Sequence, residues 1–328
     1  MPSPPRLRLL TTGGTASMTT TGEAQGATPT LGGVDLVAAV PELAHIGVEL
    51  EVEDFRKKPG ASLTIDDIAA LAARIAELEE ADDSGFIVVQ GTDTIEETAF
   101  LLDLLHNGQV PVVVTGAMRL PQQPGADGPA NLLAAVRTAA CPDARGRGCM
   151  VVMAEEIHAA RYVRKQHSSS PSAFSSPAAG PIGTLSEGTP KFSFTSPRPQ
   201  SVPLPFIAPA RVPLLTAVLG DDGEQLAQIT DRCDGLVVAA FGVGHVPESW
   251  VAPLEKAALR MPVVFASRTG VGRTATATYA FSGSERDLLQ RGLIGAGLLD
   301  PLKARILLLA YLRAGADRDD IAAAFAQF

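Results

Sequence analysis

Short apolar runs alternate with amphipathic helical segments through the first half of the chain, and this alternation limits the fold more than any other feature. The apolar runs have strand length, whereas the segments between them repeat apolar residues at helical spacing. Strands that alternate with helices form βαβ units with parallel strands. We therefore expect an α/β fold with an open, mainly parallel sheet flanked by helices. The predicted strands are 7–10, 86–89, 110–114 and 149–153, and the predicted helices are 65–78, 95–106 and 131–140. We expect Thr64 to cap the first of these helices, with Asp67 three residues on as a weaker capping-box partner.

A proline-rich segment divides the chain. Seven prolines lie from Pro190 to Pro213. Such a segment supplies neither central strands nor long helices, so we interpret it as a linker. After it the pattern continues more weakly, with strands expected at 214–219, 235–240 and 263–265 and helices at 250–259, 301–312 and 319–328. The sequence thus predicts a larger N-terminal catalytic α/β domain at 1–190, a linker at 191–212 and a smaller C-terminal α/β domain at 213–328.

The charge balance argues against nucleic acid as a partner. The formal net charge is −9, and an acidic surface repels phosphate backbones. The sequence contains no zinc-finger spacing and no basic run that would offset this charge.

Several features point to a cytoplasmic protein. No apolar stretch reaches the length of a membrane span, and residues 1–8 lack the apolar core of a secretory signal. The three cysteines have neither metal nor redox spacing, as expected of reduced thiols. The five histidines show no ligand spacing either. We expect no membrane partner, no metal and no other cofactor.

Polar residues with glycines follow three predicted strands at the point where each strand ends. Ligands of open α/β sheets bind at the carboxyl ends of the strands, so Thr15, Thr92 and Asp93 are candidates to face a ligand. A structural interpretation exists for each segment: a glycine-rich turn after the first strand, and a helix start capped by Thr94 or Asp93 after the second. The segments are 11–15 (TTGGT), 90–94 (QGTDT) and 115–119 (TGAMR).

Further segments bear on the same region. Residues 17–30 are polar and without periodicity, which is typical of a mobile loop over a site. We expect Asp127 to cap the helix that follows it, with Pro129 in its first turn, and this local role is sufficient for Asp127. Lys165 follows the fourth strand in a basic segment. Taken alone, such a lysine is usually solvated.

In combination, these segments resemble the asparaginase/glutaminase family along nearly the full chain. The glycine–threonine segments after the first two strands are similar to the two signatures of the family. Each match alone is weak, but all of them in order, with natural spacing, form a specific signal. The matching segments are 12–15, 91–94, 96–98, 115–119, 126–129, 131–132, 180–183 and 303–305.

The resemblance implies roles for individual residues. Thr15 corresponds to the nucleophile of the family. Thr92, Asp93 and Lys165 correspond to a second catalytic cluster. Glu285 corresponds to an acidic residue that a neighbouring subunit contributes to the site. The family's fold has a larger N-terminal and a smaller C-terminal α/β domain in a dimer of dimers, so we expect a homodimer or homotetramer with shared sites.

The expected reaction is hydrolysis of the side-chain amide of L-asparagine to L-aspartate and ammonia, with some glutaminase activity. An unactivated amide requires a nucleophile, a base and donors for the oxyanion, and backbone N–H groups near Thr15 and Thr92 are the expected donors. Burial would make Lys165 a base, whereas Asp93 in the same site favours the charged lysine, and the sequence leaves the balance open. Thr92 has three open roles: it relays a proton, attacks the amide or orients a water.

A free amino acid is the expected small-molecule partner, and its ammonium and carboxylate must each be matched when desolvated. Asp93 and Glu285 are the natural partners of the ammonium. The carboxylate requires hydroxyl and backbone N–H groups, for which Ser62 and the turn at Gly60 are the candidates. A backbone contact from Ala117 is a further candidate.

Four positions depart from the pattern of the family. Members carry a tyrosine in the loop after the first signature, whereas this chain has none before Tyr162. A serine is usual near Gly60, where this chain has Ser62 two residues later, His245 lies where some members have asparagines, and Gln90 replaces a common histidine. The missing tyrosine motivates an alternative, a catalytically impaired amino-acid-binding protein on the same scaffold. We favour the amidohydrolase because both threonines, the aspartate and the lysine are present.

Overall fold

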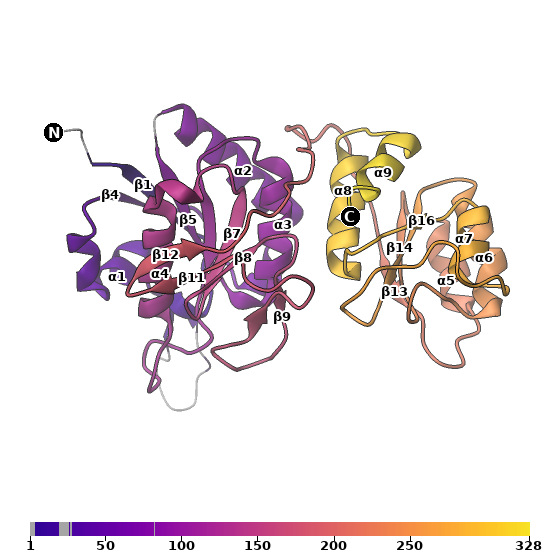
Figure 1. Cartoon of the computed structure of the whole chain (residues 1–328), viewed down its shortest axis with the longest axis horizontal. Helices are drawn as coiled ribbons and strands as arrows, with labels where there is room; N and C mark the ends of the chain where they lie inside the picture. The colour runs from indigo at the N-terminus through magenta and orange to yellow at the C-terminus, as the bar shows by residue number, and fades with distance from the viewer. Residues whose placement is uncertain (1–3, 20–25, 27, 82) are drawn as a thin grey trace. The chain divides into compact units, whose positions relative to one another are not determined.

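The computed structural model describes residues 4–19, 26, 28–81 and 83–328. The chain forms two compact units, Met1–Ser201 and Val202–Phe328, which we describe separately (Figure 1). The division lies within the proline-rich segment 191–212. The first unit extends past the expected start of that segment, because Arg198 still donates a hydrogen bond to the carbonyl of Gly108.

Within the described residues, the first unit is built on a sheet of eight strands. The strands from β7 to β4 are parallel, and β8, β11 and β12 extend the sheet through antiparallel pairs. The open, mainly parallel sheet expected from the sequence is therefore confirmed, with an antiparallel extension that was not predicted. In order across the sheet the strands are β12 (Thr189–Phe192), β11 (Gly183–Ser186), β8 (Glu156–Ala159), β7 (Cys149–Met153), β6 (Val112–Thr115), β5 (Gly85–Val89), β1 (Arg6–Thr11) and β4 (Glu49–Asp54).

Helices cover both faces of this sheet (Figure 1). All residues of β5, β6 and β7 are buried, which explains why continuous apolar runs mark these strands in the sequence. One face forms a core with α1 (Gly33–Ala38) and α4 (Gly128–Ala140). The helices α2 (Ile65–Glu80) and α3 (Ile95–Leu105) lie on the other side (Figure 1).

Short elements connect these layers. β2 (Met18–Thr19) pairs with β3 (Thr28–Pro29), and β9 (Arg164–Lys165) pairs with β10 (Phe174–Ser175), both antiparallel. The loop expected at 17–30 therefore contains a short hairpin, while its residues 20–25 and 27 lie outside the described part. Short helical turns of the 3₁₀ type are η1 (Thr15–Ser17), η2 (Pro41–His45), η3 (Gly60–Ser62), η4 (Thr92–Thr94) and η5 (Pro142–Ala144).

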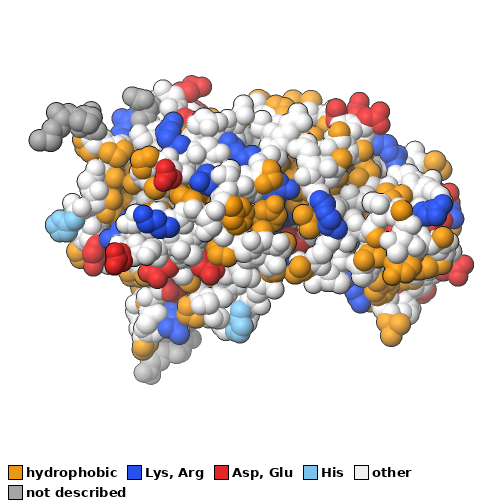
Figure 2. All heavy atoms as spheres, viewed as in Figure 1, with side chains coloured by type: hydrophobic (Ala, Val, Ile, Leu, Met, Phe, Trp, Pro, Cys, Tyr) orange, Lys and Arg blue, Asp and Glu red, His pale blue; other side chains and the backbone are white. Residues whose placement is uncertain are grey.

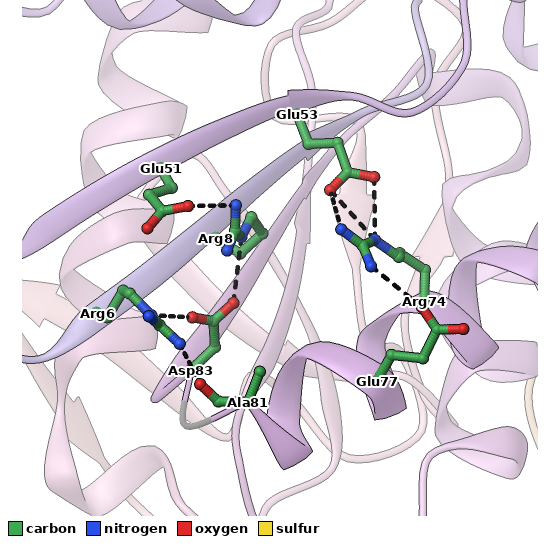
Figure 3. Close-up of polar contacts among 8 residues, drawn as sticks. All are labelled: Arg6, Arg8, Glu51, Glu53, Arg74, Glu77, Ala81 and Asp83. Atoms are coloured by element: carbon green, nitrogen blue, oxygen red, sulfur yellow. Dashed lines mark hydrogen bonds and ion pairs between the residues drawn. The ribbon is translucent and has the colours of Figure 1, made fainter.

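An ion-pair network fastens the edge strand β4 of this sheet (Figure 3). Asp83, just before β5, has a fully buried side chain between Arg6 and Arg8 of β1. A buried carboxylate is tolerated there because two guanidinium groups pair with it. Charges along an edge strand also discourage pairing with another chain. Arg8 also pairs with Glu51 of β4. A second, separate group of ion pairs joins Glu53 of β4 to Arg74 of α2, which also pairs with Glu77.

Within the described residues, the second unit is a parallel sheet of four strands in the order β13-β14-β15-β16. A core of apolar residues joins this sheet to α5 and α6. The smaller C-terminal α/β domain expected from the sequence is thus confirmed. The elements are β13 (Leu214–Thr216), α5 (Glu224–Thr230), β14 (Leu236–Ala240), α6 (Glu248–Ala258), β15 (Val263–Ser267), α7 (Glu285–Gln290), β16 (Ile294–Gly295), α8 (Pro301–Arg313) and α9 (Arg318–Phe325).

The surface in view mixes the two signs of charge. Figure 2 shows Lys and Arg side chains interspersed with Asp and Glu side chains. On this face the described residues form no continuous basic patch of the kind that nucleic acids bind. In the part of the chain that the structure describes, no helix combines the length and the apolar character needed to cross a membrane.

Candidate active site

The first candidate turn follows β1. Two glycines, Gly13 and Gly14, lead into η1, which begins at Thr15. Their φ angles are 104° and 107°, a region that L side chains rarely adopt. A Cβ atom on Gly14 would overlap the backbone nitrogen of Gly91. Glycine at this position therefore lets the chain after β1 touch the chain after β5, which places Thr15 beside the turn that carries Thr92.

The second candidate turn, η4, follows β5 and leads directly into α3. Thr92 is buried, whereas the Asp93 side chain is 65% exposed. Thr94 occupies the N-cap position of α3 but makes no capping hydrogen bond with its side chain. Its hydroxyl instead donates to the carbonyl of Gly60 at 3.1 Å. The capping prediction is therefore right about the position and wrong about the hydrogen bond.

Lys165 joins this turn to a hairpin far along the sequence. It lies on β9, and its Nζ is 2.9 Å from both Thr92 Oγ1 and Asp93 Oδ1. The Lys165 side chain is only 14% exposed, so the solvated interpretation is wrong here. Arg164, its neighbour on β9, faces Glu96 of α3 with 3.9 Å between Nε and Oε2. We call Thr92, Asp93 and Lys165 the lysine cluster.

A third turn, η3, packs against the second. A Cβ atom on Gly60 would lie 2.9 Å from the carbonyl oxygen of Gly91. A serine at position 60 would thus force the two backbones apart, which accounts for one departure from the family pattern. Ser62, at the end of the same turn, is exposed. It offers the hydroxyl that Gly60 lacks.

Asp67 fixes both ends of η3. Its carboxylate accepts the N–H of Thr64, which completes the capping box predicted for α2, and contacts Lys58 Nζ at 2.7 Å. Burial opposes the charge, but hydrogen bonds from Lys58, Thr64 and Arg56 outweigh it and hold the pKa of Asp67 well below its usual range. Lys58 precedes η3 and Thr64 follows it, so one carboxylate closes the loop that carries Ser62. The sequence predicted the cap and gave no sign of this second role.

Asp127 holds the loop after β6, in which Ala117 is buried. It lies at the N-cap of α4, as predicted, yet its side chain does not cap that helix. Its carboxylate accepts the N–H groups of Met118 and Arg119, each at 2.9 Å. Asn131 adds a bond to the same carboxylate at 3.1 Å. The local capping role is therefore wrong, because the backbone N–H groups that Asp127 accepts belong to the loop after β6 and not to the first turn of α4.

Glu285 belongs to the second unit, at the start of α7, and is 0% exposed. Its carboxylate accepts the N–H groups of Thr278 and Tyr279, both at 2.8 Å, and lies 3.1 Å from His245 Nε2. Burial opposes its charge, but these hydrogen bonds outweigh the burial and lower the pKa of Glu285. His245, which the sequence marked only as a departure from the family, is thus the side-chain partner of this acid.

The lysine cluster is suited to proton transfer. Lys165 donates to Thr92 Oγ1, so the hydroxyl proton of Thr92 is left to donate to a ligand. Such a chain can deliver a proton to a leaving group. Among the residues described, no group of three or more His, Cys, Asp or Glu side chains could hold a metal ion.

Comparison with known proteins assigns both units. Residues 6–198 match the family described as "Asparaginase, N-terminal", and residues 211–325 match the "Glutaminase/Asparaginase C-terminal domain". The chain is 38% identical over 326 residues to a "Probable L-asparaginase" of Deinococcus radiodurans, with 98% of each chain covered. It is 32% identical over 317 residues to an "L-asparaginase" of Bacillus licheniformis, with 94% of this chain and 95% of the relative covered.

The comparison of folds agrees with the comparison of sequences. A crystal structure of a "Probable Cytoplasmic L-asparaginase" from Campylobacter jejuni is similar, with a TM-score of 0.89 and 29% identity. The similarity covers 99% of this chain and 100% of that one. Together, the two family matches and the relatives of full length show that the chain belongs to the asparaginase family.

Proposed function

We propose that the protein is an L-asparaginase-type amidohydrolase, which hydrolyses the side-chain amide of L-asparagine to L-aspartate and ammonia. Its relatives bear the name L-asparaginase. The observation that carries the proposal is the position of Lys165, whose Nζ lies 2.9 Å from both Thr92 Oγ1 and Asp93 Oδ1. An amine, a hydroxyl and a carboxylate from distant segments converge there, which simple binding of an amino acid does not require.

In the first half of the proposed reaction, the Thr15 hydroxyl attacks the amide carbon, and the developing oxyanion is stabilised by backbone N–H groups near Thr15 and Thr92. Thr92 donates its proton to the leaving nitrogen and is reprotonated from Lys165. Thr15 releases its hydroxyl proton to water while the nitrogen gains one proton from the lysine cluster, so ammonia leaves, an ester on Thr15 remains, and Lys165 is left neutral.

In the second half, water replaces ammonia. A water molecule attacks the ester carbon, the Thr15 oxygen leaves and recovers its proton, and aspartate is released. In this half the lysine cluster acts as a base, because it accepts the proton of the attacking water. The same residues thus act twice, as acid and then as base.

We propose that each site combines residues of the first unit with an acid from a neighbouring subunit. Asp93 is exposed and offers a carboxylate to the substrate ammonium. Ser62 and the backbone of η3 at Gly60 serve the substrate carboxylate, and the backbone at Ala117 lines the same end of the sheet. Glu285, with its surroundings, serves the ammonium of a neighbouring subunit's site. We therefore propose a homodimer or homotetramer with shared sites.

We also propose that the protein works in the cytoplasm. Cys141, Cys149 and Cys233 are all free thiols in the structure, as expected in a reducing compartment. The similar Campylobacter jejuni protein is described as cytoplasmic.

A panel of amides tests the proposed reaction. Ammonia release is measured from L-asparagine, D-asparagine, L-glutamine and D-glutamine, with the Thr15→Ala variant, purified in the same way, as a control for contaminating amidases. We expect the highest kcat/KM for L-asparagine and a lower value for L-glutamine. Calorimetric binding of L-asparagine without ammonia from any amide would instead identify an amino-acid-binding protein.

A further inference from the structure

A hollow opens in the first unit between α1, the turn η1 and the loop that joins β6 to α4. It encloses about 510 Å³ of empty space, counting its open mouth, which is within the range of pockets that bind small molecules. Its floor is continuous with the apolar core on the α1 and α4 face of the sheet. The buried residues that the hollow shares with this core are Ala16, Leu36, Val89, Ala117 and Leu132.

The walls of the hollow offer few hydrogen-bonding groups. Leu31, Pro121 and Pro129 extend the apolar lining toward the mouth. Thr115 also lines the hollow, but its hydroxyl donates to the carbonyl of Val152 at 2.8 Å and is therefore not a donor for a ligand. An ordered water needs about two to four polar partners. An apolar group that enters the hollow therefore displaces weakly held water, which favours its binding.

Two charges of opposite sign lie at the mouth. Asp35 of α1 is exposed and Arg119, after β6, is half-buried, and both line the hollow. Asp35 Oδ2 accepts the N–H of Gly32, and Arg119 Nη1 donates to the carbonyls of Gly125 and Pro124. Within the described part of the chain, no group bonds to Asp35 Oδ1 or to Arg119 Nε and Nη2. A ligand that carries both an ammonium and a carboxylate matches these two charges.

The hollow adjoins the proposed active site, but no member of the lysine cluster lines it. It reaches the site through small residues. Ala16 follows the proposed nucleophile Thr15 in η1, and Ala117 follows β6. A Cβ atom on Gly128, at the start of α4, would lie 3.3 Å from Ala117 Cβ and 3.9 Å from Ala16 Cβ, so the three small residues meet at this end. A molecule in the hollow thus contacts the turn that carries Thr15 without occupying the lysine cluster.

We propose that this hollow is a second binding site, which takes an apolar α-amino acid of the size of leucine and regulates turnover. The apolar side chain fills the hollow, the ammonium pairs with Asp35, and the carboxylate pairs with Arg119. L-Asparagine is a poor occupant, because its side-chain amide would lose its hydrogen bonds against apolar walls. The regulatory part rests on the proposed asparaginase function, whereas the binding of the amino acid does not.

Calorimetry with related probes tests the binding. L-Leucine is compared with isocaproate, which lacks the ammonium, with isoamylamine, which lacks the carboxylate, and with L-alanine, which lacks most of the apolar side chain. Each of these three should bind about tenfold or more weakly than L-leucine, because a hydrogen bond to a charged group or most of the buried apolar area is lost. Saturating L-aspartate, which occupies the proposed substrate site, should change the Kd of L-leucine by less than about threefold.

Two substitutions at the end of α1 form a matched pair. Ala39 lines the hollow, whereas its neighbour Ala38 does not, and both are exposed. Ala39→Leu should abolish binding of L-leucine, and Ala38→Leu should leave it unchanged. Asp35→Asn, which can still accept the N–H of Gly32, should weaken binding of L-leucine by about tenfold and leave that of isocaproate unchanged. Thermal unfolding checks the fold of each variant.

Steady-state kinetics test the regulation. L-Leucine should change kcat for L-asparagine by about twofold to tenfold through η1 and leave KM unchanged, and Ala39→Leu should abolish this effect. The inference is overturned if L-leucine does not bind, if L-aspartate displaces it, if it raises KM alone, or if Ala39→Leu binds it as the wild-type protein does. Failure of the proposed function appears separately, as no ammonia from L-asparagine with the wild-type protein.

Discussion

Two carboxylates are proposed to serve the same ammonium, and the protein holds them in opposite ways. Asp93 in the first unit is 65% exposed and bonded to Lys165. Glu285 in the second unit is 0% exposed and bonded to backbone N–H groups and to His245. The exposed acid can meet a ligand without rearrangement, whereas the buried one is covered within a single chain and bonded to His245. The comparison teaches that family resemblance can identify the residues of a site without identifying the atom that touches the ligand.

The difference in exposure between Asp93 and Glu285 follows from the local backbone. Asp93 lies within the short turn η4 after β5, and its carboxylate is exposed and bonded to Lys165. Glu285 starts α7, and the chain before that helix folds back so that the N–H groups of Thr278 and Tyr279 point at its carboxylate. These donors stabilise the negative charge and occupy one of the two oxygens, Oε1, while Oε2 faces His245.

The largest effect is expected from the two threonines of the first unit. Thr15→Ala and Thr92→Val should each lower kcat by about 10⁴-fold, because nucleophile and proton donor act as a unit. Thr94→Val is a matched control in the same turn, since it removes a hydroxyl that bonds Gly60 rather than Lys165, and it should cost about tenfold. Steady-state ammonia release and circular dichroism measure activity and fold. Near-normal turnover would remove the affected threonine from the mechanism.

A smaller effect, and the sharpest test of the comparison, is expected from the two acids. Asp93→Asn should lower kcat/KM for L-asparagine by about 100- to 1000-fold, because it removes the exposed charge and a partner of Lys165. Glu285→Gln should lower kcat/KM by only about tenfold, because the glutamine amide keeps the shape of the side chain and can still accept the N–H groups of Thr278 and Tyr279. Both variants are compared at one pH by ammonia release. Equal losses would show that the two carboxylates contact the ammonium alike.

Subunit mixing tests whether Glu285 and its partner His245 serve a neighbouring subunit. We combine Thr15→Ala with the double variant His245→Phe/Glu285→Gln, each of low activity alone. Random exchange within a two-fold dimer rebuilds about a quarter of the sites with intact parts, so activity should approach about a quarter of the wild-type value. Exchange is verified by native mass spectrometry. No regain of activity after verified exchange would count against shared sites.

The smallest effect is expected on the free energy of unfolding. It comes from two buried groups outside the site, so it reports on the fold and not on catalysis. Burial lowers the pKa of His158 to about 4. The stability that the neutral imidazole gives to the fold is therefore fully present above pH 6.5, the pKa of the group in the unfolded chain, and is lost as the pH falls toward 4. Burial raises the pKa of Asp103 to about 6, against a hydrogen bond from Cys149 and the charges of Arg198 and Arg161. The stability that the protonated Asp103 gives to the fold is therefore present below pH 3.8, the pKa of the group in the unfolded chain, and is lost as the pH rises through 6.

His158 and Asp103 therefore change the pH dependence of stability in opposite directions, and substitutions can separate the two contributions. His158→Asn should reduce the loss of unfolding free energy between pH 6.5 and pH 4 by about 3 kcal/mol, whereas Asp103→Asn should increase that loss by a similar amount. Urea unfolding at a series of pH values measures both. The account of these buried groups would be wrong if the two variants shifted the pH dependence in the same direction.

The parts of the fold that were predicted well are those with local signals. β7 has the bounds expected from its apolar run, and α2 starts at its predicted cap, Thr64. β6 starts at Val112 rather than at 110, because Pro111 offers no backbone donor. The antiparallel strands β8, β11 and β12 were missed, because each has four residues and too little alternation to distinguish it from a loop.

The site was predicted as a set of residues, while its contacts were not. Resemblance grouped Thr92, Asp93 and Lys165, but the bonds of Lys165 depend on a hairpin of two-residue strands that no periodicity marks. The capping hydrogen bonds predicted for Thr94 and Asp127 were wrong, and both errors have one physical cause. A polar side chain at a helix start bonds whichever partner the tertiary structure brings nearest, and local spacing does not contain that information.

The most direct test of the lysine cluster is a double-mutant cycle on kcat with Lys165→Met and Thr92→Val. Because Lys165 acts through the Thr92 hydroxyl at 2.9 Å, the double variant should turn over L-asparagine no more slowly than the slower single variant. Losses that multiply in the double variant, or turnover of Lys165→Met close to the wild-type value, would contradict the proposed proton transfer.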